Sequence, residues 1–225
     1  MIESKTKKSV AIMMITYLVM FYGLWTVYAL VISPYLDEFP TIIRVISKNL
    51  SKLLLWTLPV VIQLKYIYKN NLLDYLKLDK NISKGFIYGA IFGALITLYI
   101  MYRKVMISGG LSFNLLFDIN AWIGAVLLVG FTEEVVFRGF ILQKFEEIMN
   151  FKMANIITSI LFVFIHFPRW IQEGNFSSYT FIINSALFLI IFSYTLGVML
   201  KKTGSLWSCI IFHAANNFAM FAFNL

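Results

Sequence analysis

Charge, cysteine and histidine are scarce in this chain of 225 residues. Charged residues account for 13% of the sequence and hydrophobic residues for 60%, and the mean hydropathy is +0.80. This composition leaves too little polar surface to cover a soluble globule of this size, so it excludes a soluble fold. The single cysteine, Cys209, excludes a disulfide framework and a cysteine-rich metal site, and we expect it to be a packed thiol.

The sequence instead contains long apolar runs. A membrane-spanning helix needs about 20 predominantly apolar residues. Runs of this kind lie at residues 9–33, 53–68, 85–102, 115–142, 153–167, 180–200 and 205–225. They predict an all-α polytopic membrane helical bundle with about seven transmembrane helices, in a single integral membrane domain over residues 1–225. The first run is too long for the core of a signal peptide and lacks a small-residue cleavage site, so we expect a retained first helix.

Two segments carry repeats at a spacing of four residues. In residues 39–52, basic side chains recur on one helical stripe: Arg44, Lys48 and Lys52. This pattern predicts an interfacial helix that leads into the second apolar run, and it favours lipid head-group anchoring over a substrate contact. The third apolar run contains glycines at the spacing that lets membrane helices approach closely: Gly85, Gly89 and Gly93. We expect these glycines to serve helix packing.

The distribution of Lys and Arg predicts the orientation of the chain. With the N-terminus inside and seven spans, twelve basic residues fall inside: Lys5, Lys7, Lys8, Lys65, Lys69, Lys77, Lys80, Lys84, Lys144, Lys152, Lys201 and Lys202. Six fall outside: Arg44, Lys48, Lys52, Arg103, Lys104 and Arg169. This bias favours a cytoplasmic N-terminus and an outside C-terminus. The second run is interrupted by Pro59, and every later segment inverts if that run does not cross. Because the net charge of +8 is spread over short loops, we expect no nucleic-acid partner.

A few ionisable residues lie within the later apolar runs: Glu133, Glu134, Arg138, His166 and His213. A charge in hydrocarbon costs about 2.5–3.5 kcal/mol even on lenient scales, so such residues are functional by default and face the protein interior. Glu134 and Arg138 are four residues apart and so share a helix face, where they can form an ion pair. Glu133 is then left as an unpaired carboxylate, which is suited to act as a general base on water.

The same spacing of four residues recurs twice more. Phe162 and His166 share one helix face, and His213 and Asn217 share another, so three helices can meet across one polar cavity. In this order, Glu133-Glu134-x-x-x-Arg138, Phe162-x-x-x-His166 and His213-x-x-x-Asn217 resemble the CPBP family of intramembrane proteins, also called the Abi family. The family is named for CAAX proteases and bacteriocin-processing enzymes. The resemblance covers about residues 121–225, which form the motif-bearing core.

This resemblance implies a glutamate-dependent intramembrane endopeptidase. Glu133 with His166 would activate the hydrolytic water, and His213 with Asn217 would donate hydrogen bonds to the tetrahedral oxyanion. Glu134 with Arg138 would hold the first motif helix in register as structural support. Asn216 is the alternative to Asn217, although the family spacing favours Asn217. The implied substrate is a membrane-associated peptide, lipopeptide or lipoprotein.

Several alternatives stay open at the level of sequence. Zinc is considered because the family was long labelled metalloprotease, but the His-Glu-x-x-His signature is absent and no two histidines share a helix turn. We therefore expect no metal or other cofactor. The same chemistry can serve acyl transfer or an accessory role in lipoprotein or lipid modification. A non-catalytic immunity or regulatory protein is the alternative of another class. The composition, rich in Lys, Ile, Asn and Phe, resembles a bacterial plasma-membrane protein.

Overall fold

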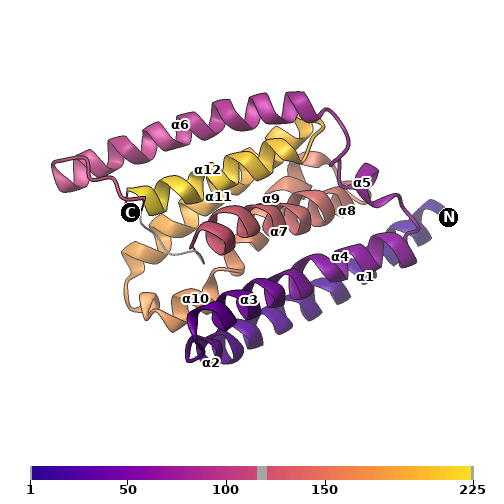
Figure 1. Cartoon of the computed structure of the whole chain (residues 1–225). Helices are drawn as coiled ribbons and strands as arrows, with labels where there is room; N and C mark the ends of the chain where they lie inside the picture. The colour runs from indigo at the N-terminus through magenta and orange to yellow at the C-terminus, as the bar shows by residue number, and fades with distance from the viewer. Residues whose placement is uncertain (1, 116–120, 224–225) are drawn as a thin grey trace.

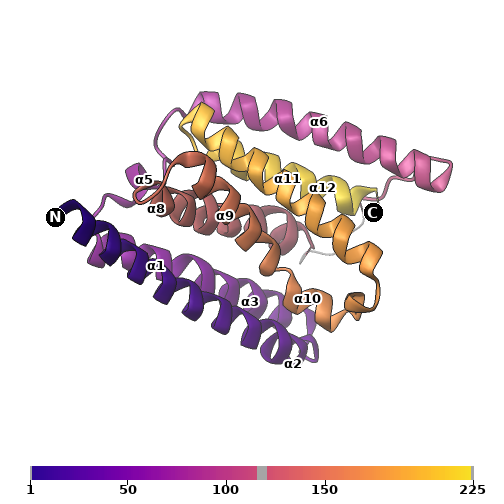
Figure 2. The same ribbon diagram turned by 180° about the vertical axis from the view of Figure 1, so that it is seen from behind.

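The computed structural model describes residues 2–115 and 121–223 of the chain. All regular secondary structure in these residues is helical, which confirms the predicted all-α class. Figure 1 and Figure 2 show the helices as a bundle in which α6 and α12 lie along one side and α1, α3 and α4 along the other. Between these two sides runs the helix that contains α7 and α8.

The N-terminal part of the chain is a hairpin of two long helices. The first comprises α1 (Ile2–Val27), the π-helical segment η1 (Tyr28–Ile32) and α2 (Ser33–Asp37). After a short turn the second comprises α3 (Thr41–Lys52), η2 (Leu53–Thr57), α4 (Leu58–Ile62) and η3 (Gln63–Ile67). Pro34 and Pro59 each follow a π-helical segment, as expected because proline lacks an N–H and its ring crowds the preceding turn.

The second helix of this hairpin includes the segment 39–52, which the sequence predicts as an interfacial helix leading into the second apolar run. The two are continuous, because residues Thr41–Ile67 form one helical run of 27 residues. The second apolar segment is therefore long enough to cross a membrane, because α3 extends it at its N-terminal end. As a result, the basic stripe of α3 lies beside other helices of the protein.

Two later helices, α6 and α12, pack closely against each other. A short helix, α5 (Leu72–Tyr75), precedes α6 (Ile82–Ser108), which lies along α12 (Trp207–Ala222) in both views (Figure 1, Figure 2). A Cβ atom added at Gly89 would lie 2.7 Å from the Cβ of Ile211, and one at Gly93 would lie 2.9 Å from the Cβ of Ala215. These distances are shorter than real side-chain contacts allow. The prediction that these glycines permit close helix packing is therefore confirmed.

The central helix of the bundle consists of η4 (Ala121–Leu128), α7 (Val129–Glu134), η5 (Val135–Leu142) and α8 (Gln143–Glu146). Every residue from Thr132 to Leu142 is buried. The chain continues through α9 (Phe151–Phe164), α10 (Phe167–Gln172), the 3-10 turn η6 (Asn175–Ser177) and α11 (Tyr179–Thr203). Asn150 and Ser178 accept hydrogen bonds from the first turns of α9 and α11, and Gly204, with φ of +68°, ends α11.

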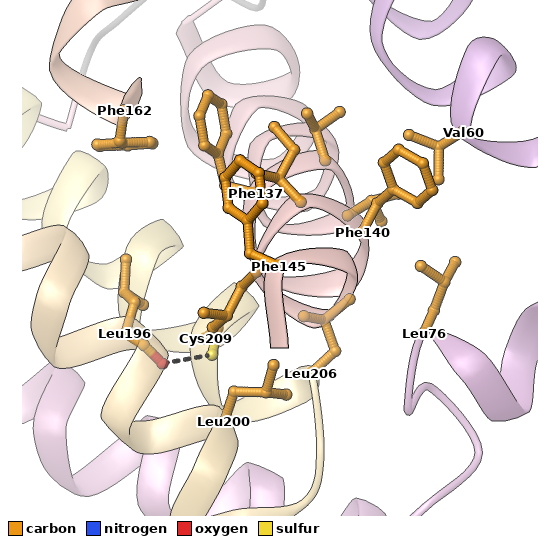
Figure 3. Close-up of a cluster of buried hydrophobic side chains, with 14 of the residues drawn as sticks. Val60, Leu76, Phe137, Phe140, Phe145, Phe162, Leu196, Leu200, Leu206 and Cys209 are labelled. Carbon is orange, nitrogen blue, oxygen red and sulfur yellow. Dashed lines mark hydrogen bonds between the residues drawn. The ribbon is translucent and has the colours of Figure 1, made fainter. Parts of the chain in front are cut away.

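Apolar side chains from these helices form one large core cluster around η5. Figure 3 shows Phe137, Phe140 and Phe145 of the central helix between Val60 and Leu76 on one side and helices α9, α11 and α12 on the other. Cys209 is fully buried in this cluster, and its thiol donates a hydrogen bond to the Leu196 carbonyl at 3.2 Å. The cysteine is thus a packed thiol, as predicted.

Five helical runs in the described residues are long and apolar enough to span a membrane: Lys7–Asp37, Thr41–Ile67, Ile82–Ser108, Phe151–Gln172 and Tyr179–Thr203. The protein is therefore an integral membrane protein, but the predicted count of seven spans is not established. The run predicted at 115–142 includes residues 116–120, which lie outside the described residues, and it carries the three motif charges. The last run, of which residues 224–225 also lie outside, forms α12 with 16 residues. At about 1.5 Å per residue, α12 is shorter than the roughly 30 Å hydrocarbon core.

The two ends of the bundle differ in composition. Segments 68–81, 143–150 and 201–207, here called the lysine-rich end, contact one another through hydrogen bonds such as Leu206 N to Lys77 O at 3.0 Å and Trp207 Nε1 to Leu78 O at 2.8 Å. The Tyr75 hydroxyl donates a hydrogen bond to Glu147 at 3.1 Å. The pKa of this hydroxyl is raised mainly because the side chain is buried, and also because the Glu147 carboxylate is negatively charged. The opposite end is formed by the α2–α3 turn, α10 and the end of α12, and here a polar cavity opens.

Candidate active site

A cavity of about 640 Å³ lies between the N-terminal hairpin, the central helix, α10 and α12. Its lining includes Glu133, His166, His213 and Asn217, the four residues predicted to be catalytic, together with Lys52. Apolar residues of the surrounding helices also line it, as do the charged and polar residues Ser33, Asp37, Lys48, Asn49, Arg169, Gln172 and Glu173. The structure thus brings the three motifs together, although Glu133 in α7 and Asn217 in α12 are 84 positions apart in the sequence.

The adjacent glutamates at the end of α7 have different surroundings. Successive residues of an α-helix point about 100° apart, so Glu133 reaches the cavity whereas Glu134 is fully buried. The Glu134 Oε1 atom accepts hydrogen bonds from Arg138 at 3.1 Å and from His213 Nδ1 at 2.6 Å. The predicted pairing of Glu134 with Arg138 is therefore present, and His213 joins it.

Arg138 completes this buried cluster. Its second guanidinium nitrogen donates to the backbone carbonyl of Ser193 in α11 at 3.1 Å, and its charge lies 4.6 Å from the centre of the Phe162 ring. The cluster therefore connects the central helix with α9, α11 and α12. We expected this pair to hold one helix in register, but it joins four helices.

Glu133 is not unpaired, which corrects the sequence prediction. The Lys52 ammonium lies 3.2 Å from Glu133 Oε1, and the side chains of these two residues are only 14% and 8% exposed. Lys48, one turn earlier, pairs with Asp37 at 2.6 Å. For Lys48 and Lys52 the expected lipid head-group anchoring is therefore wrong. These two lysines face the cavity because α3 continues into the second long helix and packs beside η4 of the central helix.

His213 is oriented by Glu134. Since an ionised carboxylate only accepts hydrogen bonds, the Nδ1 atom of His213 carries a hydrogen. The opposite ring nitrogen, Nε2, then points toward Glu133, and it lies 4.0 Å from Glu133 Oε2. This separation is beyond hydrogen-bonding distance, so the two groups lie near each other without direct contact. The Phe192 ring packs edge-on against the imidazole with a centroid distance of 5.2 Å.

His166 lies where α9 breaks. Pro168 has no N–H for the carbonyl of Phe164, so α9 ends at Phe164 and α10 begins at Phe167. The Nδ1 atom of His166 lies 2.9 Å from the Phe162 carbonyl, which requires a hydrogen on Nδ1 and leaves a lone pair on Nε2 of the neutral ring. Trp25 supports the broken end by donating to the Ile165 carbonyl at 2.7 Å.

Asn217, and not Asn216, reaches the cavity. Its side-chain amide donates to the Ala125 carbonyl at 2.8 Å, and its carbonyl oxygen accepts from the buried Asn216 at 3.2 Å. The geometry therefore places at the cavity the residue that the family spacing favoured. Asn216 instead orients its neighbour.

Metal binding was considered because the site contains carboxylates and histidines. Over residues 2–115 and 121–223, no group of three or more His, Cys, Asp or Glu side chains has positions that could hold a metal ion. The expectation of a metal-free reaction stays a prediction.

Comparison with known proteins places part of the chain in a family. Residues 114–219 match the family model described as type II CAAX prenyl endopeptidase Rce1-like. No match was found among curated proteins or among solved structures. The matched segment contains all three motifs, from Glu133 to Asn217, but not Lys52. Over residues 114–219 this match confirms the resemblance to the CPBP family that the motifs predicted.

Proposed function

We propose that the protein is a glutamate-dependent intramembrane endopeptidase that cleaves a membrane-associated peptide, lipopeptide or lipoprotein. One observation carries the proposal. Glu133, His166, His213 and Asn217, from three separate motifs, line a single cavity in an otherwise apolar bundle. Burying such groups without a function is costly in a membrane protein.

The proposed reaction begins at Glu133. Its carboxylate takes a proton from a water molecule, and the water oxygen forms a bond to the carbonyl carbon of the scissile peptide. His166 assists because its Nε2 lone pair accepts a second hydrogen bond from the same water. The hydrogen bond from His166 Nδ1 to the Phe162 carbonyl supports this assignment, since it fixes the required tautomer.

The tetrahedral intermediate carries a negative oxygen that needs hydrogen-bond donors. His213 can donate from Nε2 when both of its ring nitrogens carry a hydrogen, with Nδ1 bonded to the Glu134 carboxylate. Asn217 has two amide hydrogens, of which Ala125 accepts one, and the other is assigned to the oxyanion. Each such donor is worth about 2.7–4 kcal/mol in measured cases. The intermediate then collapses, the C–N bond breaks, and Glu133 returns its proton to the leaving amine.

The proposed orientation has the N-terminus in the cytoplasm and the C-terminus outside, in a bacterial plasma membrane. Its support is the number of basic residues at the lysine-rich end, which are Lys69, Lys77, Lys80, Lys144, Lys201 and Lys202, because Lys and Arg are enriched on the cytoplasmic side of membrane proteins. In this orientation the cavity opens toward the outer face, from which the substrate enters.

The test is cleavage of a quenched fluorescent peptide that ends in S-farnesyl Cys-Val-Ile-Met, presented to the detergent-solubilised full chain. This probe has the C-a-a-X pattern of prenylated proteins. Glu133→Gln should lower kcat by about 10²–10⁴-fold, because the amide cannot take a proton. Glu146→Gln is the matched control, since Glu146 pairs with Lys201 at the lysine-rich end and should keep wild-type activity.

Three results would contradict this proposal. The first is a wild-type protein that leaves the lipopeptide intact, and the second is a Glu133→Gln variant with wild-type turnover. The third is trapping of the acyl group by hydroxylamine as a hydroxamate. Direct attack by water leaves only a carboxylate, so a hydroxamate would indicate acyl transfer through an acyl-enzyme.

A further inference from the structure

Lys52 occupies a position in the cavity that the family motifs do not include. It lies at the end of α3, more than 60 residues before the matched segment 114–219. From its contacts we infer that Lys52 is a positioning residue that fixes the orientation of the Glu133 carboxylate for the reaction. The inference rests on the proposed function, because it assigns Glu133 as the base.

The lysine makes the two oxygens of Glu133 different. The ammonium binds Oε1 at 3.2 Å, while Oε2 lies on the side of His213, 4.0 Å from its Nε2. An ammonium on one oxygen restricts rotation of the carboxylate. Oε2 is therefore the oxygen left to take the proton from water, and it lies near His213 Nε2, which is assigned to the oxyanion.

The ammonium itself is held by aromatic rings. It lies 4.9 Å from the centre of the Trp56 ring and 5.7 Å from that of Trp25. Trp56 is fully buried, and Trp25 is fixed by its hydrogen bond to the Ile165 carbonyl, next to His166. Cation–π contacts of this length stabilise a cation in a confined place. The N-terminal hairpin therefore provides an aromatic socket for the lysine and, through Trp25 and Ile165, connects it to the helix end that bears His166.

The other cations of the cavity are committed to other partners. Lys48 pairs with Asp37 at 2.6 Å, and Arg169 pairs with Glu173 at 2.7 Å. Within the described part of the chain, Lys52 is the cation whose ion pair involves Glu133. A substitution at Lys52 therefore removes the positive partner of the base without disturbing those two pairs.

The experiment compares Lys52→Met, Lys52→Arg and Lys201→Met in the full chain, with the quenched S-farnesyl Cys-Val-Ile-Met peptide as probe. Lys201 is a matched control because it also pairs with a glutamate, Glu146, at 2.7 Å and lies 5.2 Å from an aromatic ring, that of Phe151. We expect Lys52→Met to lower kcat by up to about 100-fold, the effect typical of a misplaced catalytic group, while KM changes by less than about twofold. Lys52→Arg should recover most of kcat, and Lys201→Met should match the wild type.

A purely structural ion pair would give another result. Lys52→Met would then lower the melting temperature but leave kcat per folded molecule unchanged, and this outcome overturns the inference. It is distinguished from failure of the proposed function by Glu133→Gln. An inactive Glu133→Gln with a fully active Lys52→Met rejects the role of Lys52 alone, whereas an active Glu133→Gln rejects both.

A second measurement covers the case in which Lys52→Met does not accumulate. In that case kcat is measured for Lys52→Gln, which keeps a polar side chain of similar length in the socket but no positive charge. A fall in kcat that Lys52→Arg reverses supports the inference, and wild-type kcat in Lys52→Gln overturns it.

Discussion

Two glutamates that are neighbours in sequence have opposite environments. Glu133 faces a cavity, and its partners Lys52 and His213 approach from other helices without enclosing it. Glu134 is sealed, because its side chain and that of its partner Arg138 are fully buried, and it also binds His213. The difference arises because adjacent helical residues point about 100° apart. One turn of helix thus provides both Glu133, which faces the cavity, and Glu134, which holds the surrounding side chains in place.

The sealed cluster, formed by Glu134, Arg138 and the Nδ1 side of His213, determines the geometry of the open cluster, formed by Glu133, Lys52 and the Nε2 side of His213. Glu134 binds Nδ1 of His213, so it determines which ring nitrogen points toward Glu133. Arg138 in turn fixes Glu134 and reaches α11 through Ser193. The buried carboxylate of Glu134 therefore orients His213, which lines the cavity. Substitutions in the sealed cluster should change both stability and activity, whereas those in the open cluster should change mainly activity.

The largest stability effect is expected for Glu134→Gln. It strands the buried guanidinium of Arg138 and should destabilise the fold by about 3–5 kcal/mol, as for other broken buried pairs. Glu133→Gln should cost much less, because Lys52 and Glu133 border a cavity that water can enter. Thermal melting of the detergent-solubilised variants measures both values.

The double variant Glu134→Gln with Arg138→Gln sharpens the comparison. Removing both charges should recover part of the lost stability, but the recovery should be incomplete because His213 Nδ1 still lacks its carboxylate partner. Equal losses for Glu133→Gln and Glu134→Gln, with no recovery in the double variant, would mean that the two environments are assigned wrongly.

A similar contrast exists between Asn217, at the cavity, and Asn216, which is buried. If Asn217 donates to the oxyanion, Asn217→Ala should lower kcat by about 10²–10³-fold. Asn216→Ala removes one hydrogen bond to Asn217, an interaction of about 0.5–1.5 kcal/mol, and should lower kcat by no more than about tenfold. Steady-state kinetics with the farnesylated peptide measure both effects. The reverse order would assign the donor to Asn216.

The sequence was sufficient to predict the helical class, the close packing of the α6 glycines and the Glu134–Arg138 pair. All three follow from local rules, because helix periodicity alone decides which residues share a face. The family was also predicted correctly, since its three motifs keep a fixed order and spacing. The same spacing favoured Asn217 over Asn216, because a residue four positions after His213 shares its helix face.

Contacts between distant segments could not be predicted in this way. Lys52 is 81 residues from Glu133, and the basic stripe of α3 resembles that of an interfacial helix. Its position next to Trp56 was the available signal, because a lysine followed one turn later by tryptophan in an apolar helix can be held by cation–π contact. The link from Glu134 to His213 spans 79 residues and also lies outside any local pattern. The number of spans could not be predicted either, because it depends on two helices that are unlike ordinary spanning helices. The helix α12 has only 16 residues, and the central helix carries the three charged residues of the first motif.

The smallest effect is expected from removal of metal ions, and the comparison of the two clusters explains why. In the open cluster, Lys52 already takes one oxygen of Glu133, and in the sealed cluster His213 Nδ1 is committed to Glu134. A metal ion bound to Glu133 would lie beside the Lys52 ammonium, and repulsion between the two positive charges opposes its binding. Dialysis of the full chain against a chelator should therefore leave kcat within about twofold of its starting value, with no stoichiometric zinc by elemental analysis. One zinc per chain that is lost together with activity, and restored by added zinc, would show instead that Glu133 and the histidines bind a metal and that the Lys52 pair belongs to an inactive state.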